Sequence, residues 1–216
     1  MQIYIIPGFL GHPAEKIFIK LVAELSALGH TVNIIAWPYF PEDLNKYGFT
    51  TMLAHCRNIL KGINLEKTII LGFSMGGIIA TYLAGEFKFK KLGLIVSPYQ
   101  AGTKDDLEEK YYDWKQTGFR KVTSSVYGEL QIPFSFIEDA RKYNALDEIP
   151  KVTCQILFVA GENDKNVPYK VSQKLYNQAK TTKEWHLITG MEHRYQYQSL
   201  NMIDTVNKLI IKFIET

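Results

Sequence analysis

The sequence predicts an α/β fold in which about six mostly parallel strands form one sheet with helices on both faces. Short β-branched runs alternate with longer segments whose apolar residues recur at helical spacing. The run at 68–71 is apolar on both faces, as expected for a central parallel strand covered by helices. With 216 residues, of which 46% are hydrophobic and 22% charged, the chain suits one globular domain.

The N-terminal part begins with a predicted strand at 3–6, which a Pro-Gly pair ends because that pair favours a turn. Residues 13–28 carry apolar side chains at the spacing of an amphipathic helix. Gly29 is its expected terminator, since glycine adopts the left-handed conformation without penalty. A second strand is predicted at 32–36.

The rest of the chain repeats this alternation. Apolar residues from Met52 to Leu60 predict a second helix, and small residues within 75–87 would let a third helix lie close to the sheet. A closing amphipathic helix is predicted over 203–213. The remaining strands are predicted at 68–71, 92–96, 155–160 and 185–188.

One segment interrupts the pattern. Residues 1–98 and 150–216 are predicted to form the core, and 99–149 a cap or lid insertion with weak strand signals. About a third of the 28 aromatic residues of the chain fall in this insertion. Such rings need an apolar partner, which is either the body of the protein or a substrate.

Composition and motifs exclude several classes of function. The net charge of +3 is too small to argue for nucleic acid, and no apolar run approaches the ~20 residues of a membrane span. The first ten residues lack the features of a signal peptide. The two cysteines and five histidines form no metal-ligand spacing, and no P-loop lysine is present. We therefore expect a soluble cytoplasmic protein without metal or cofactor.

The most specific motif is Gly72-Phe73-Ser74-Met75-Gly76, between a predicted strand and a predicted helix. A nucleophile elbow requires this strand–turn–helix context. Glycines two residues before and after the serine permit the tight turn. The turn would lift the Ser74 hydroxyl above the carboxyl end of the sheet, where open α/β sheets bind ligands. A serine hydroxyl is a weak nucleophile alone, so a base and an orienting acid should follow it.

A carboxylate and an imidazole follow in the chain order expected with such an elbow. Asp164 lies just after the fifth predicted strand and His193 just after the last. Because carboxyl ends of parallel strands share one edge of a sheet, both can converge on Ser74. His193 would take the serine proton, and Asp164 would fix the imidazole tautomer. Asp147 is a second possible acid, but it precedes a strand and would lie at the opposite edge.

A tetrahedral oxyanion would also need hydrogen-bond donors. The backbone N–H of Met75, directly after the serine, is one candidate. The second should come from the glycine-containing loop after the first strand, and we predict the N–H of Phe9. Substrate contacts are expected from the same loop and from aromatic side chains of the insertion; these residues are Leu10, Tyr112, Trp114, Phe134 and Phe136.

Taken together, the chain resembles the α/β-hydrolase fold superfamily from Ile3 to the C-terminal helix. The resemblance rests on the serine elbow, on the acid loop Gly161-Glu162-Asn163-Asp164, and on the order of the three side chains. It implies a minimal α/β-hydrolase fold, with 99–149 at the position of the cap. Members commonly begin with two further strands, and many have His-Gly where this chain has Pro7-Gly8.

The resemblance implies a serine hydrolase that cleaves a small or medium carboxylic ester through an acyl-Ser74 intermediate. A thioesterase, an acyltransferase or a lyase could use the same three residues. A noncatalytic ligand receptor on the same fold is the alternative from another class. The expected partner is a small-molecule ester or thioester, without nucleic acid or an integral membrane segment, and the oligomeric state stays open.

Overall fold

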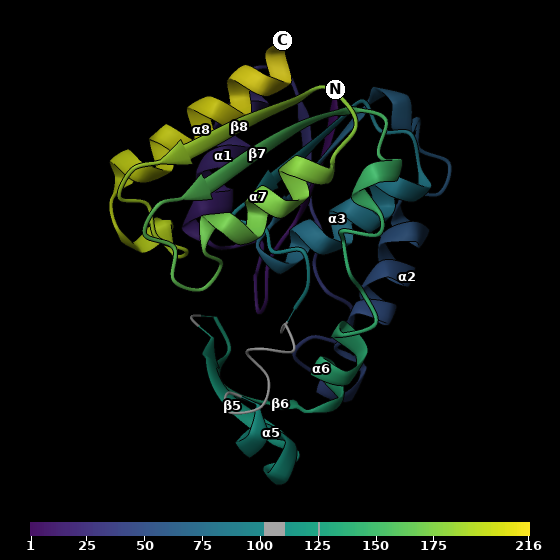
Figure 1. Ribbon diagram of the computed structural model, residues 1–216, viewed down its shortest axis with the longest axis vertical. Helices are drawn as coiled ribbons and strands as arrows, with labels where there is room; N and C mark the ends of the chain where they lie inside the picture. The colour runs from purple at the N-terminus through teal and green to yellow at the C-terminus, as the bar shows by residue number, and fades with distance from the viewer. Residues whose placement is uncertain (102–110, 125) are drawn as a thin grey trace. The chain divides into compact units, whose positions relative to one another are not determined.

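The computed structural model describes residues 1–101, 111–124 and 126–216 (Figure 1). These residues form two compact units. The first comprises residues 1–35, 62–99 and 145–216, and the second 36–61 and 100–144. The second unit thus holds most of the predicted insertion. It also includes residues 36–61, which the sequence analysis assigned to the core.

The first unit is built on a six-stranded sheet in the order β2-β1-β3-β4-β7-β8, and every neighbouring pair is parallel. The predicted α/β class and strand number are confirmed. The strands are β1 (Gln2–Ile6), β2 (Thr31–Ile34), β3 (Thr68–Phe73), β4 (Lys91–Ile95), β7 (Gln155–Gly161) and β8 (Lys183–Ile188). The chain runs outward from β1 to β2 and then returns to the other side of β1 with β3. The connections after β1 and β3 therefore diverge, which makes this point a topological switch point of the sheet, where α/β folds commonly bind ligands.

Helices cover both faces of this sheet (Figure 1). On one face, α1 (Lys16–Ala27) and α8 (Leu200–Glu215) pack their apolar stripes against alternate strand residues such as Ile5 and Leu71. On the other face lie α3 (Met75–Glu86) and α7 (Tyr169–Gln178). Burial on both faces explains why β3 and β4 are apolar throughout.

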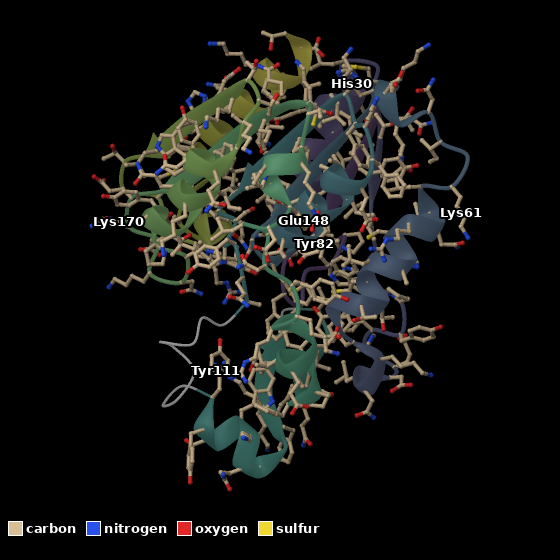
Figure 2. All side chains as sticks on the ribbon, turned by 45° about the vertical axis from the view of Figure 1, so that its right-hand side comes forward. His30, Lys61, Tyr82, Tyr111, Glu148 and Lys170 are labelled. Carbon is tan, nitrogen blue, oxygen red and sulfur yellow. The ribbon has the colours of Figure 1, made fainter. Side chains whose placement is uncertain are left out.

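Helix α7 was not predicted from the sequence. Only Ser172 and Leu175 of this helix are buried, so its apolar stripe is too narrow to give a helical pattern. Three single-turn helices, η2 (Leu65–Lys67), η3 (Ile149–Lys151) and η4 (Tyr195–Tyr197), complete the first unit. Glu148 (Figure 2), just before η3, lies against α3, because a Cβ placed at Gly85 would be 2.9 Å from its Oε2.

The second unit contains η1 (Leu44–Lys46), α2 (Phe49–Ile59), α5 (Tyr112–Thr117), the antiparallel hairpin β5 (Phe119–Ser124) and β6 (Gly128–Pro133), and α6 (Ser135–Ala140). Residues 36–61 group with it because α2 packs on α6. The Phe49 and Phe136 rings lie 6.0 Å apart, and Asp139 accepts the Thr50 N–H at 2.8 Å. This carboxylate satisfies a donor at the N-terminus of α2 that the helix itself leaves unpaired.

Across the described residues, none of the helices combines the length and the apolar character that crossing a bilayer demands.

Candidate active site

The backbone at Ser74 has the sharp turn that the Gly-x-Ser-x-Gly motif predicts. Ser74 lies between β3 and α3 with φ 51° and ψ −125°, a region that non-glycine residues seldom adopt. Its N–H donates to the carbonyl oxygen of Ile95 on β4 at 2.9 Å. This bond to β4 holds the strained residue on the sheet. The Ser74 side chain is half-buried at the carboxyl edge.

The motif glycines are required by close backbone approach. A Cβ at Gly72 would lie 2.5 Å from the Cα of Gly77. A Cβ at Gly76 would overlap the carbonyl oxygens of Ile6 and Pro7, at the end of β1. The start of α3 is thus pressed against β1 and β3, which fixes the direction in which the Ser74 hydroxyl points.

The structure brings the three predicted side chains together. Ser74 Oγ lies 2.9 Å from His193 Nε2, and His193 Nδ1 lies 2.8 Å from Asp164 Oδ2. An ionised carboxylate can only accept, so the contact with Asp164 places the imidazole proton on Nδ1. The lone pair of Nε2 then faces the hydroxyl, which is the tautomer that a general base needs.

Asp164 is held firmly in its loop after β7. Its side chain is 0% exposed, whereas that of His193 is 17% exposed. Oδ1 accepts the backbone N–H groups of Asn166 at 2.9 Å and Val167 at 2.7 Å, and Oδ2 faces the imidazole. Both oxygens of this buried carboxylate are therefore satisfied, and only one of them faces His193.

A second acidic side chain joins the two loops that carry Asp164 and His193. Glu162 Oε2 accepts the N–H of Gly190 at 3.0 Å. Gly161, at the end of β7, adds to this join, because a Cβ there would overlap the carbonyl oxygen of Met191. These contacts fix the distance between the acid and the base through the backbone.

The loop after β1 lies beside the serine. A Cβ at Gly8 would come 3.1 Å from Ser74 Cβ and 3.7 Å from Ser74 Oγ. The Gly11 N–H closes a turn on the Gly8 carbonyl at 3.0 Å, with Phe9 and Leu10 between them and Leu10 at φ 57°. Met75 is the first residue of α3, so its N–H has no partner inside the helix. The use of the Phe9 and Met75 N–H groups as oxyanion donors stays a prediction.

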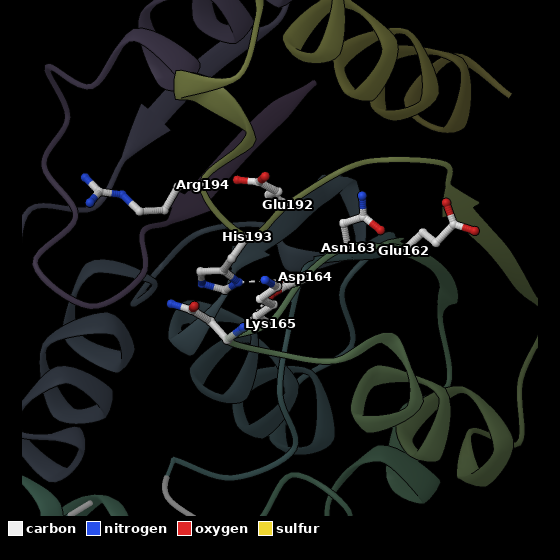
Figure 3. A pocket seen from close by; sticks show the side chains of 8 residues that line it. Glu162, Asn163, Asp164, Lys165, Glu192, His193 and Arg194 are labelled. Atoms are coloured by element: carbon white, nitrogen blue, oxygen red, sulfur yellow. Dashed lines mark hydrogen bonds and ion pairs between the residues drawn. The ribbon is translucent and has the colours of Figure 1, made fainter.

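A polar hollow of about 660 Å³ lies on the His193 side (Figure 3). Its lining combines acid, base and amide side chains from the loops after β7 and β8, namely Glu162, Asn163, Asp164, Lys165, Asn166, Glu192, His193 and Arg194. Three of these lining residues, Lys165, Asn166 and Arg194, were not predicted as site residues from the sequence. Their position within two residues of Asp164 or His193 is the signal that could have found them.

The aromatic side chains predicted to contact substrate lie in the second unit in differing environments. Trp114 and Phe136 are buried, with their rings stacked at 6.4 Å, and the Trp114 indole donates to the Ile132 carbonyl at 2.9 Å. Tyr112 is 59% exposed, and Phe134 is half-buried. The packing of Trp114 and Phe136 accounts for these two rings, so a substrate role for any of the four stays a prediction.

Among residues 1–101, 111–124 and 126–216, no cluster of three His, Cys, Asp or Glu side chains is arranged to hold a metal ion.

Neither thiol is suited to act as a nucleophile. Burial raises the pKa of the Cys56 thiol to about 12 and that of Cys154 to about 11. Because the thiolate is the reactive form, we expect iodoacetamide to leave both cysteines of the folded protein unmodified at a pH of about 8. Intact-mass spectrometry checks this, with urea-unfolded protein as the control that takes up two labels. Modification of the folded protein would contradict the raised pKa values of these thiols.

Comparison with known proteins places the chain in a family. No curated protein matches the sequence. Among solved structures, alpha/beta hydrolase domain-containing protein 10 from mouse is 21% identical with a TM-score of 0.79, over 99% of this chain and 89% of that one. An esterase from Exiguobacterium antarcticum is 18% identical with a TM-score of 0.75, over 99% of this chain and 92% of that one.

A third solved structure, an alpha/beta hydrolase enzyme from the metagenome of lagoon sediments of Mar Chica, Morocco, is 19% identical with a TM-score of 0.72. It is matched over 99% of this chain and 90% of that one. At such identities the likeness shows the fold. The model of the alpha/beta hydrolase fold family matches residues 3–211, almost the whole chain. The chain therefore belongs to the alpha/beta hydrolase fold family.

Proposed function

We propose that the protein is a serine hydrolase that cleaves a small or medium carboxylic ester through an acyl-Ser74 intermediate. The observation that carries this proposal is the continuous hydrogen-bond chain from Ser74 Oγ through the imidazole of His193 to the buried Asp164 carboxylate. A hydroxyl, a base and an orienting acid at these distances form the arrangement that activates a serine.

In the proposed mechanism, His193 Nε2 accepts the hydroxyl proton as Ser74 Oγ attacks the ester carbonyl carbon. The carbonyl oxygen becomes an oxyanion, which the N–H groups of Met75 and Phe9 would stabilise. Asp164 stabilises the imidazolium that has formed. When the tetrahedral intermediate collapses, the alkoxide leaves with the proton from His193 and the acyl group stays on Ser74.

A water molecule then releases the acyl group. His193 takes a proton from the water as its oxygen attacks the acyl carbon, and returns a proton to Ser74 Oγ as the carboxylic acid departs. A thioester would follow the same course with a thiol as leaving group, so it belongs to the same proposal. The two free cysteines support a reducing, cytoplasmic location for this chemistry.

A fluorophosphonate probe tests the proposal, because it reacts with an activated serine hydroxyl. We expect the wild type to take up one probe and Ser74→Ala none, whereas Ser26→Ala, at an exposed serine on α1, should label like the wild type. Peptide mass spectrometry locates the adduct, and turnover of p-nitrophenyl esters of increasing acyl length then defines the preferred substrate.

Two results would argue against the proposal. A wild type that neither labels nor turns over any ester would favour the noncatalytic receptor. Equal labelling of Ser74→Ala would place the reactive group elsewhere.

A further inference from the structure

One acidic side chain fastens the loop that follows β1. Glu15 is the residue before α1, and its Oε1 accepts the backbone N–H of His12 at 3.2 Å. In return, the Glu15 N–H donates to the His12 carbonyl at 3.0 Å. This reciprocal pair closes the chain at the end of the loop whose Gly8 lies against Ser74. The position of the loop beside the serine therefore depends on a bond that the Glu15 side chain makes.

The same carboxylate interacts with the segment that carries the base. The positive charge of Arg194, next to His193, favours the ionised form of Glu15, and the Glu15 charge in turn opposes ionisation of Tyr195. In Figure 3 the Arg194 side chain extends away from His193 toward the N-terminal part of the chain, drawn in purple. Glu15 thus bonds to the loop after β1 and lies within electrostatic range of the two residues that follow the base.

The surroundings give this carboxylate a rigid frame. Tyr195 is 1% exposed and belongs to the same apolar core as Phe18 of α1 and Phe73, the residue before Ser74. The rings of Phe18 and Phe73 meet edge to face at 5.1 Å. The core therefore fixes the start of α1 against the serine turn and the segment after His193, and Glu15 provides a polar link at that junction.

We propose that Glu15 is a positioning residue. Its carboxylate holds the loop after β1, which contains the predicted Phe9 oxyanion donor, in a fixed position relative to Ser74 and the segment that carries His193. The inference rests on the proposed function. Glu15 touches no reacting atom in this scheme, and it acts through its hydrogen bond to the His12 backbone and through its charge near Arg194.

The energetics support a role beyond stability. Desolvation by burial raises the pKa of Glu15, and the His12 N–H bond and the charge of Arg194 oppose that rise only in part. When the pKa of a carboxyl group is higher in the folded than in the unfolded protein, the folded protein loses stability as the pH rises through the folded-state pKa. At neutral pH the charge therefore costs stability, and Glu15→Gln should be at least as stable as the wild type. A charge kept at such a cost beside an active site is expected where function requires it.

The test compares Glu15→Ala, Glu15→Gln and Glu24→Ala in the full chain. Glutamine keeps an oxygen acceptor for the His12 N–H and lacks the charge, whereas alanine removes both. Glu24 is a control on α1, the helix that Glu15 precedes, where it contacts Lys20 and Asn207. With a p-nitrophenyl ester, Glu15→Ala should lower kcat on the order of 10- to 100-fold with KM changed less than about threefold. Glu15→Gln should recover part of the loss, and Glu24→Ala should match the wild type.

A second readout reports directly on the oxyanion donors. Sulfur accepts hydrogen bonds more weakly than oxygen, so the ratio of kcat/KM for an ester and its matching thionoester measures how well the N–H donors are placed. Glu15→Ala should reduce this ratio, because misplaced donors no longer favour oxygen. A loss of fold alone would lower both rates equally and leave the ratio unchanged. The melting temperature of each variant is also measured, and we expect that of Glu15→Gln to equal or exceed that of the wild type.

The outcomes separate this inference from the proposed function. If the wild type reacts and both Glu15 variants keep its kcat and its ester-to-thionoester ratio, the inference about Glu15 is wrong, whereas the proposed function stands. The same holds for a fall in kcat that merely follows a fall in stability at an unchanged ratio. If Glu15→Ala does not fold, Glu15→Gln decides, because its expected stability is not lower and its kcat should still fall. A wild type that does not react with any ester or probe would overturn the proposed function and this inference with it.

Discussion

Asp164→Asn is expected to lower kcat for ester hydrolysis on the order of 10⁴-fold while the protein stays folded. The reason is that the two carboxylate oxygens of Asp164 have different partners. Oδ1 accepts the backbone N–H groups of Asn166 and Val167. An asparagine would keep its carbonyl oxygen at these donors and turn its NH₂ group toward His193 Nδ1. The imidazole proton would then move to Nε2, where it blocks transfer from the Ser74 hydroxyl.

The measurement is kcat on a p-nitrophenyl ester, with far-UV circular dichroism and a melting curve to show that the fold is kept. Asp147→Asn is the matched control, because this exposed residue precedes β7, at the opposite edge of the sheet from the site. We expect Asp147→Asn to match the wild type. A similar fall in kcat for both variants, or none for Asp164→Asn, would remove Asp164 from the proposed mechanism.

Gly76→Ala is expected to destabilise the protein by about 3 kcal/mol. The added methyl group would overlap two backbone carbonyl oxygens, those of Ile6 and Pro7, at the end of β1. Backbone at the end of a buried parallel strand cannot move aside without breaking its ladder of hydrogen bonds. We therefore expect a displaced α3, a lower urea midpoint for unfolding, and loss of the Ser74 turn and its reactivity.

Gly85→Ala is the control within the same helix. Its methyl group would meet the Glu148 carboxylate at 2.9 Å, the end of a side chain that can rotate away. Alanine favours a helix interior over glycine by roughly 0.5–1 kcal/mol, so this variant should be as stable as the wild type or more so. Equal midpoints for Gly76→Ala and the wild type would contradict the close contact of α3 with β1.

The sequence was sufficient to predict the sheet and the convergence of the Ser74, His193 and Asp164 side chains at its carboxyl edge. Strands and long amphipathic helices leave periodic patterns within about ten residues of chain, and the Gly-x-Ser-x-Gly turn is equally local. The step from there to Asp164 and His193 needed only one general rule, that parallel strands end at a common edge. Because that rule holds for the whole sheet, residues separated by 29 and 119 positions could be assigned to one place without coordinates.

Elements with weak local patterns were missed. The hairpin β5–β6 lies in a segment where most strand residues are exposed, so no alternation of buried apolar residues marks it. The grouping of residues 36–61 with the second unit is set by contacts such as Phe49 with Phe136. Those two aromatic residues are 87 positions apart, and either could equally have packed elsewhere.

The sequence by itself determined which fold this chain adopts and which hydroxyl, imidazole and carboxylate meet at its edge, since periodicity and chain order encode both. Only the tertiary structure decided the hydrogen bonds that Ser74 and Asp164 make to His193, the burial of Trp114 and the placement of Glu15 within electrostatic range of the His193 segment. These features depend on distances of a few ångströms between side chains from remote segments. Such distances follow from the packing of the whole core, which no local pattern specifies.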